Sequence, residues 1–159
     1  MTKKLLPLAL FLYSTHLLAH GGIDHKKAVI THTPEQHEKM AMTGIAEDYK
    51  AKIEPIFKGK CFDCHSNQTT YPWYYKIPGI HTLMNSHIEE ARSHLDFSKG
   101  YPFISHVKPV EDLKAIQKSV EEDQMPPLYY RVLHSQMKVT AEEKKQIRDW
   151  VEASLKKLQ

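Results

Sequence analysis

The chain contains only two cysteines, Cys61 and Cys64, and His65 directly follows the second one. A C-x-x-C-H sequence has three chemical interpretations: a redox-active dithiol, half of a structural zinc site, or the attachment sequence of a c-type haem. In the third case the two thiols add to the vinyl groups of the porphyrin, and the adjacent imidazole binds the iron from one face. The residues around the pair have to discriminate between these interpretations.

The neighbouring residues favour haem over the other two interpretations. A dithiol of the thioredoxin type usually lies between a strand and a helix, whereas the residues around Cys61 show helical spacing. A zinc site with two cysteines needs two histidines about three to five residues apart, but His81, His87 and His94 are spaced more widely. We therefore expect one haem c per chain, with zinc and a dithiol as the alternatives.

A c-type haem iron has a second axial position, and its ligand separates electron carriers from proteins that bind small molecules. Met125 stands in the sequence "EEDQMPPLYY", between two expected helices. A methionine in a proline-bounded loop is less suited to core filling than one on a helix face, so Met125 is the preferred distal ligand. The reserve candidates are three histidines: His81, His87 and His134.

The elements that position these residues are expected to be helices. Apolar residues recur at helical spacing in four regions, and Thr140 with Glu143 forms a capping box at the start of the last one. The stretch "TTYPWYYKIPG" contains two prolines and a terminal glycine, which favours an aromatic-rich loop. We predict an all-α fold, a bundle of about four to five helices. The four regions are approximately residues 45–60, 79–95, 110–120 and 140–158.

The N-terminus has the pattern of an export signal. The sequence "MTKKLLPLALFLYSTHLLAHGG" combines a basic start, an apolar run and small residues, which is typical of a cleaved secretory signal peptide. We expect the signal at residues 1–19 with cleavage near 19–21, a flexible histidine-containing leader at 20–44 in which a helix starts near Thr33, and the haem-binding domain at 45–159. A metal site on the leader histidines is a less favoured interpretation.

The charge of the chain gives no reason to expect a nucleic-acid partner. The formal net charge is +3, and removal of the two lysines in the signal leaves a mature chain near +1. Such a balance lacks the basic surface that nucleic acids require. After signal removal no other apolar stretch reaches the length of a membrane span. We therefore expect a periplasmic protein without a stable membrane span.

Three longer stretches extend the argument beyond the C-x-x-C-H motif: "CFDCHSNQTTYPWYYKIP", "HIEEARSHLDFS" and "MPPLYYRVLHSQMKVTAEEKKQIRDWV". Through them the chain resembles the bacterial haem-binding domain proteins, which are small mono-haem relatives of cytochrome c, over about Ile53 to Val151. The resemblance implies a cytochrome c-like helical domain in which Cys61 and Cys64 hold the haem. It also implies His65 as the proximal ligand and Met125 as the distal one.

The same resemblance points to further residues around the haem. Asn67, Trp73, Tyr130 and Arg92 match family positions that line the haem or meet its propionates. Their alternative interpretation is structural, with Trp73 and Tyr130 as core aromatics and Arg92 as a solvated helix residue. The chain departs from the family pattern at "DFSKGYPF", where Lys99 and Gly100 precede the expected aromatic residue. The departure concerns the packing of this loop.

Together these observations predict an exported mono-haem c-type cytochrome that transfers single electrons between transient redox partner proteins and is not an enzyme. The alternative is a haem-based sensor or small-molecule binder with a weak or open sixth iron position. A peroxidase is less favoured, because only one C-x-x-C-H sequence is present and no acid–base set accompanies it.

Overall fold

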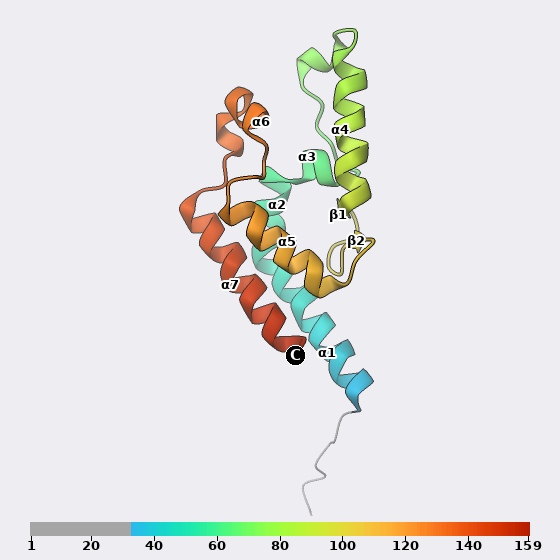
Figure 1. Ribbon diagram of the computed structural model, residues 1–159, viewed down its shortest axis with the longest axis vertical. Helices are drawn as coiled ribbons and strands as arrows, with labels where there is room; N and C mark the ends of the chain where they lie inside the picture. The colour runs from blue at the N-terminus through green and yellow to red at the C-terminus, as the bar shows by residue number, and fades with distance from the viewer. Residues whose placement is uncertain (1–32) are drawn as a thin grey trace, which may run out of the picture. The chain divides into compact units, whose positions relative to one another are not determined.

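The computed structural model describes residues 33–159, and this part of the chain is built almost entirely from helices (Figure 1). The prediction of an all-α fold is confirmed. Three long helices, α4, α5 and α7, accompany a continuous helical stretch at the N-terminal end. The α-helices are α1 (Pro34–Asp48), α2 (Glu54–Lys60), α3 (Phe62–His65), α4 (Ile80–His94), α5 (Pro109–Glu121), α6 (Leu128–Leu133) and α7 (Ala141–Lys157).

The predicted signal peptide lies outside the described residues, as does the leader up to residue 32. α1 begins at Pro34, where Thr33 accepts a hydrogen bond from the backbone N–H of Gln36 and the Gln36 side chain accepts one from Thr33. Residues 34–44 are therefore helical, with the start near Thr33 that the sequence predicts. Within residues 33–159, no helix is both long and apolar enough to cross a membrane.

A continuous helical stretch leads the chain to the first cysteine. α1 passes into a π-helical segment, η1 (Tyr49–Ile53), and then into α2, which ends at Lys60. Its apolar residues at helical spacing are almost completely buried, as the sequence predicts. They pack with α5 and α7 into one core. The largest contributions from this stretch are Ile45, Tyr49, Ile53 and Phe57, each with at most 2% of its surface exposed.

α7 closes the other side of this core. Its N-terminus has the predicted capping box, in which Thr140 accepts from the N–H of Glu143 and the Glu143 side chain accepts from Thr140. Ile147, Trp150 and Val151 are buried on one face of the helix. α5 packs against α7 through Leu113 and its neighbours on the same face.

The loop that departs from the family pattern folds into the core. Leu95–Asp96 (β1) pairs antiparallel with Ile104–Ser105 (β2). Gly100, with φ of 75°, makes the turn between them in a conformation that favours glycine. One aromatic residue before the turn and two after it point inward, where they pack against Tyr49, Phe57 and Trp150. These residues are Phe97, Tyr101 and Phe103.

Candidate functional site

Cys61, Cys64 and His65 lie on one helical turn directly after α2. The N–H groups of Cys64 and His65 both donate to the carbonyl oxygen of Cys61, at 3.2 and 2.9 Å. Side chains three or four residues apart on such a turn share a face. All three residues line one cavity of about 610 Å³, and neither thiol is in a disulfide. The turn therefore presents two thiols and an imidazole to the same space.

The imidazole of His65 is fixed by the end of α4. Its Nδ1 lies 2.8 Å from the carbonyl oxygen of Leu95. Because a carbonyl only accepts, Nδ1 must carry the proton, which leaves Nε2 with a lone pair. Burial lowers the pKa of His65 and outweighs the backbone hydrogen bonds that favour the charged form. The ring is thus held in the neutral tautomer that metal ligation requires.

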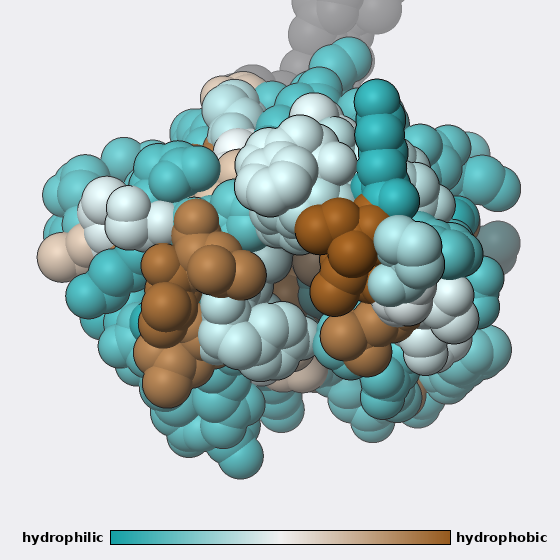
Figure 2. Space-filling model, turned by 90° about the horizontal axis from the view of Figure 1, so that it is seen from above, coloured by the Kyte–Doolittle hydropathy of each residue, from teal (hydrophilic) through white to brown (hydrophobic). Residues whose placement is uncertain are grey.

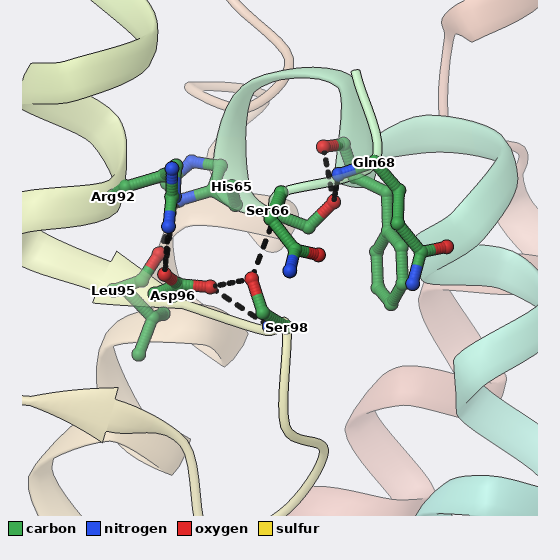
Figure 3. Close-up of polar contacts among 9 residues, drawn as sticks. His65, Ser66, Gln68, Arg92, Leu95, Asp96 and Ser98 are labelled. Carbon is green, nitrogen blue, oxygen red and sulfur yellow. Dashed lines mark hydrogen bonds and ion pairs between the residues drawn. The ribbon is translucent and has the colours of Figure 1, made fainter. Parts of the chain in front are cut away.

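A hydrogen-bond network holds the segment that positions Leu95 (Figure 3). Arg92 donates to Asp96 at 2.9 Å, and the backbone N–H of Ser98 donates to the same carboxylate at 2.8 Å. The hydroxyl of Ser98 also donates to Asp96 and accepts from the backbone N–H of Asn67 at 2.9 Å. Arg92 and Asn67 therefore act from outside the cavity, by tying the end of α4 to the segment after His65.

The environment of the two thiols does not suit a redox dithiol. Burial, reinforced by the charge of Cys64, raises the pKa of Cys61 to about 12. Burial also raises the pKa of Cys64, with Asp63 adding to the effect. A reactive dithiol needs a lowered thiol pKa and usually follows a strand, whereas Cys61 follows α2.

The zinc interpretation lacks its further ligands. Within residues 33–159 there is no group of three or more His, Cys, Asp or Glu side chains placed to hold a metal ion. Of the histidines considered for such a site, His87 and His94 line the same cavity as the two cysteines and His81 does not, but none completes such a group. The four-ligand set that structural zinc needs is therefore not assembled in this part of the chain.

The cavity has the size and lining of a cofactor site. Its volume lies within the range of about 300 to 1,000 Å³ that small-molecule and cofactor pockets occupy. Apolar side chains from α5 and from the C-terminal end of α4 make up much of its walls, and Phe57 and Phe97 connect the cavity to the core. A flat, mostly apolar group with thiol-reactive substituents fits this lining. The apolar residues from the two walls include Ala91, Leu95, Ala115, Ile116 and Val120.

Met125 reaches the same cavity from the segment between α5 and α6. It lines the cavity, its side chain is 41% exposed, and its backbone N–H donates to Ser119 at 3.2 Å. The structure thus brings the two predicted iron ligands, His65 and Met125, to one space from distant parts of the chain.

The reserve histidines differ in their access to the cavity. His87 lines it, next to Tyr129 with the ring centroids 5.8 Å apart. His81 is exposed and does not line it. His134 has partners at both ring nitrogens, Tyr74 at 2.9 Å and the carbonyl of Tyr130 at 3.1 Å. His87 is therefore the histidine that remains as an alternative to Met125.

The expected pocket residues divide into two groups. Tyr130 lines the cavity, and its hydroxyl donates to Asp63 at 3.2 Å. Trp73 does not line it: the side chain is 80% exposed and packs edge-on against Tyr74. Trp73 is therefore neither a core nor a cavity residue in this structure. Asn67 is exposed and also lies outside the lining.

Sequence reasoning missed one buried acid in the cavity wall. Asp112 of α5 is 4% exposed, lines the cavity and accepts a hydrogen bond from Ser105 at 2.8 Å. Burial raises the pKa of its carboxyl, and the Ser105 hydrogen bond offsets part of this effect. The signal was present, because Asp112 stands four residues before Ile116 and eight before Val120 on the apolar face.

Comparisons with known proteins agree with this description of the cavity. A family model described as a haem-binding domain matches residues 24–153. A curated relative, the cytochrome c peroxidase Ccp of Escherichia coli (strain K12), is 32% identical over 93 residues, which cover 57% of this chain. The chain spans only 20% of the length of that relative. No solved structure matches the chain.

Proposed function

Because the chain belongs to the haem-binding domain family, we propose that it carries one covalently attached haem c and transfers single electrons outside the cytoplasm. The observation that carries this proposal is the convergence of Cys61, Cys64, His65 and Met125 on one cavity of about 610 Å³. In this assignment the thiols form the thioether links, His65 is the proximal ligand and Met125 is the distal ligand.

The residues of the chain have distinct tasks in this proposal. A bound haem iron supplies reversible one-electron chemistry. His65 offers an Nε2 lone pair, because its Nδ1 proton is committed to Leu95. Phe57, Phe97 and Ile116 are buried in the lining and exclude water from one side of the cavity. Met125 contributes a thioether, which favours the reduced state of the iron and raises its potential.

The open end of the cavity supports an exchange of electrons with other proteins. Met125 and Tyr129 both line the cavity and are 41% and 60% exposed. In Figure 1, α6 and the N-terminal end of α4 lie at the same end of the described structure, and Figure 2, which views that end, shows two groups of apolar residues with a hollow between them. We call this surface the apolar rim. It consists of Trp73, Ile77, Leu83, Leu128, Tyr129, Val132 and Leu133.

The apolar rim is almost free of charge. Segments 66–88 and 124–137 contain only Lys76 and Arg131 among Asp, Glu, Lys and Arg residues. Arg131 is largely covered and pairs with Asp123. Depletion of charge with enrichment of aromatic residues is the composition of interface cores. The proposed partner is a redox protein with an uncharged, apolar surface next to its own cofactor, bound through a small, transient interface.

The proposal of export rests on the N-terminal sequence. The basic start and apolar run within residues 1–19 are the features that a secretory signal requires. We propose a periplasmic location after signal cleavage. In that oxidising compartment a pair of exposed thiols would form a disulfide unless a cofactor occupied them.

The cofactor assignment is tested by producing the full chain in a bacterium that attaches c-type haem in its periplasm. We expect the purified protein to gain the mass of one haem, to keep it after denaturation, and to give a c-type haemochrome spectrum. A variant with Cys61→Ala and Cys64→Ala should lose the covalent haem. Haem that is extracted intact from the wild-type protein by acidified solvent would contradict covalent attachment.

A second candidate function is a haem-based sensor or small-molecule binder, and the 41% exposure of Met125 favours it. A distal ligand on an exposed segment is easier to displace than a buried one. The two candidates differ in the ferric spectrum and in ligand binding. An electron carrier shows the weak far-red band of iron bound to methionine and binds carbon monoxide slowly when reduced, whereas a sensor lacks the band and binds it readily.

A further inference from the structure

α6 carries the residues next to Met125, but it is hardly held by apolar packing. None of its six residues is buried, and four of them have between 60% and 73% of their surface exposed. An element with so few buried apolar contacts belongs to the least stable part of a domain unless polar contacts hold it. The four exposed residues are Leu128, Tyr129, Val132 and Leu133.

Tyr130 connects α6 to the turn that carries the cysteines. Its hydroxyl donates to Oδ2 of Asp63 at 3.2 Å. Its ring stacks on that of His134, with the centroids 4.3 Å apart and the planes 20° from parallel. Asp63 also accepts from the backbone N–H of Thr70, at 2.9 Å, which fixes the carboxylate. The contact therefore joins α6 to α3 directly.

His134 connects the end of α6 to the aromatic loop. Its Nδ1 lies 3.1 Å from the carbonyl oxygen of Tyr130, so Nδ1 is the protonated nitrogen of the neutral ring. Nε2 is then an acceptor, and the hydroxyl of Tyr74, 2.9 Å away, donates to it. Tyr74 belongs to η2 (Trp73–Lys76), which packs against α4. His134 thus links α6 to the wall of the cavity that α4 forms.

We propose that Tyr74, Tyr130 and His134, which we call the α6 anchor, are positioning residues that hold Met125 at the cavity. α6 starts at Leu128, and only Pro126 and Pro127 separate it from Met125. Proline fixes one of the two backbone angles, so a shift of α6 is passed on to Met125 rather than absorbed between them. The proposal rests on the proposed function, in which Met125 is the distal ligand.

Other contacts of this region do not replace the α6 anchor. Arg131 of α6 donates to the carbonyl oxygen of Asp123 at 2.9 Å, and Asp123 pairs with Lys144 of α7 at 2.9 Å, but this contact reaches neither α3 nor η2. Lys60 donates to the carbonyl oxygen of Gln136 at 2.5 Å, which lies beyond the end of α6. Only the α6 anchor joins α6 itself to both α3 and η2.

The first test compares Tyr74→Phe with Tyr75→Phe in the haem-loaded protein. Tyr75 belongs to the same loop, but its hydroxyl donates to Asn85 of α4 at 3.1 Å and does not reach α6. Carbon monoxide binding to the reduced protein requires Met125 to leave. Loss of one hydrogen bond should accelerate that binding roughly three- to tenfold in Tyr74→Phe, with little change in Tyr75→Phe. Equal rates in the two variants would overturn the proposal.

A double-mutant comparison sharpens this test. If Tyr74 and His134 act through one hydrogen bond, Tyr74→Phe combined with His134→Phe should accelerate binding about as much as the stronger single variant. Fully additive effects on the logarithm of the rate would overturn the pairing. His134→Phe keeps an aromatic ring for the stack on Tyr130 but also removes the contact of Nδ1 with the Tyr130 carbonyl, so only the non-additive part of the effects reports on the Tyr74–His134 hydrogen bond.

Hydrogen exchange separates the α6 anchor from the assignment of Met125. Exchange of the α6 amides should be roughly three- to tenfold faster in Tyr74→Phe than in the wild type and unchanged in Tyr75→Phe. If the wild-type protein lacks the far-red band, Met125 is not the ligand. Hydrogen exchange of the α6 amides then still tests whether the α6 anchor holds α6. Equal α6 exchange in all three proteins would overturn it, whatever the ligand is.

Discussion

The segment that carries His65 and the segment that carries Met125 reach the same cavity but are held by different kinds of contact. The carbonyl oxygen of His65 accepts a hydrogen bond from the N–H of Phe97 at 2.7 Å, and the next residue, Ser66, is completely buried. Phe97 belongs to the aromatic core. Met125, in contrast, is 41% exposed and is followed by a helix without a buried residue.

This difference indicates separate roles for the two sides of the cavity. The His65 side is part of the core, so its local opening should require about as much free energy as unfolding of the domain. The Met125 side depends on a few polar contacts, each of which contributes about 1 kcal/mol. We therefore expect that substitutions on the two sides alter attachment of the proposed haem and exchange of its proposed distal ligand independently.

The largest effect is expected from His65→Ala. Removal of the imidazole takes away the proposed proximal ligand, so the haem should be lost or bound without a stable low-spin spectrum. The measurement is haem content per chain together with the reduced spectrum. His81→Ala is the matched control, because His81 is exposed and does not line the cavity. Normal spectra in His65→Ala would show that another residue is the proximal ligand.

Phe97→Ala tests whether the His65 side is part of the core. Phe97 is 4% exposed and packs against Phe57 and Phe103. Its truncation should lower the free energy of unfolding by about 3–5 kcal/mol. Val132→Ala, on α6 and 73% exposed, should change it by less than about 0.5 kcal/mol. Urea unfolding of the haem-loaded variants measures both, and similar losses would remove the contrast between the two sides.

Asp96 and Asp112 should respond to pH in opposite directions. Burial would raise the pKa of Asp96, but hydrogen bonds from Ser98 and Arg92 outweigh it and lower that pKa. Its contribution to stability is therefore present above the unfolded value near 3.8 and is lost as the pH falls through the folded value. Asp96→Asn should cost about 1.5–3 kcal/mol at neutral pH and progressively less in acid.

The pKa of Asp112 is raised, chiefly by burial, so its contribution to stability changes with pH in the opposite direction to that of Asp96. The wild-type protein loses stability as the pH rises from 3.8 through the folded pKa, because the carboxylate must be charged while buried. Asp112→Asn removes this loss, so its stability relative to the wild type should increase with pH. Unfolding midpoints between about pH 3 and 7 measure both variants. Parallel pH profiles for Asp96→Asn and Asp112→Asn would contradict this assignment.

The smallest effect on haem content is expected from Met125→Ala. The proposed covalent links and His65 are unchanged in this variant, so the haem should be retained in full and the free energy of unfolding should fall by less than about 1 kcal/mol. The far-red band of the ferric protein should disappear, and carbon monoxide should bind the reduced protein readily. Met137→Ala, which removes a half-buried methionine outside the cavity, should keep the band. A band that survives in Met125→Ala would point to another distal ligand.

The sequence predicted the His65 side of the molecule better than the Met125 side. The helix before Cys61, the helix at 80–94 and the capped helix from Ala141 all carry long apolar stripes, and the structure confirms each of them. The π-helical segment η1 was not predicted, because the spacing of Tyr49 and Ile53 suits either kind of helix. In α2 and α7 this periodicity marks residues of the core, whereas in α4 only Ile88 is buried and Leu83 is exposed.

The Met125 side carries much weaker signals. α6 has six residues, follows two prolines and buries none of its side chains, so it has no apolar stripe to recognise. The roles of His134 and Tyr74 depend on hydrogen bonds between residues that are distant in the sequence. Spacing along the chain contains no information on such pairs. Trp73, which the family resemblance places near the haem, is 80% exposed and does not line the cavity.

The near absence of charge on the apolar rim has a kinetic consequence. Oppositely charged surfaces attract over a Debye length of about 8 Å at physiological ionic strength, which accelerates association and makes it sensitive to salt. A partner protein that approaches the apolar rim gains no such attraction, because the rim is almost free of charge. Encounters there should proceed at unsteered rates of about 10⁵ to 10⁷ M⁻¹ s⁻¹ and should change little between dilute buffer and concentrated salt. Under the proposed function, partner selection at this surface would depend on fit and desolvation, and electron exchange should be insensitive to the ionic composition of the surroundings.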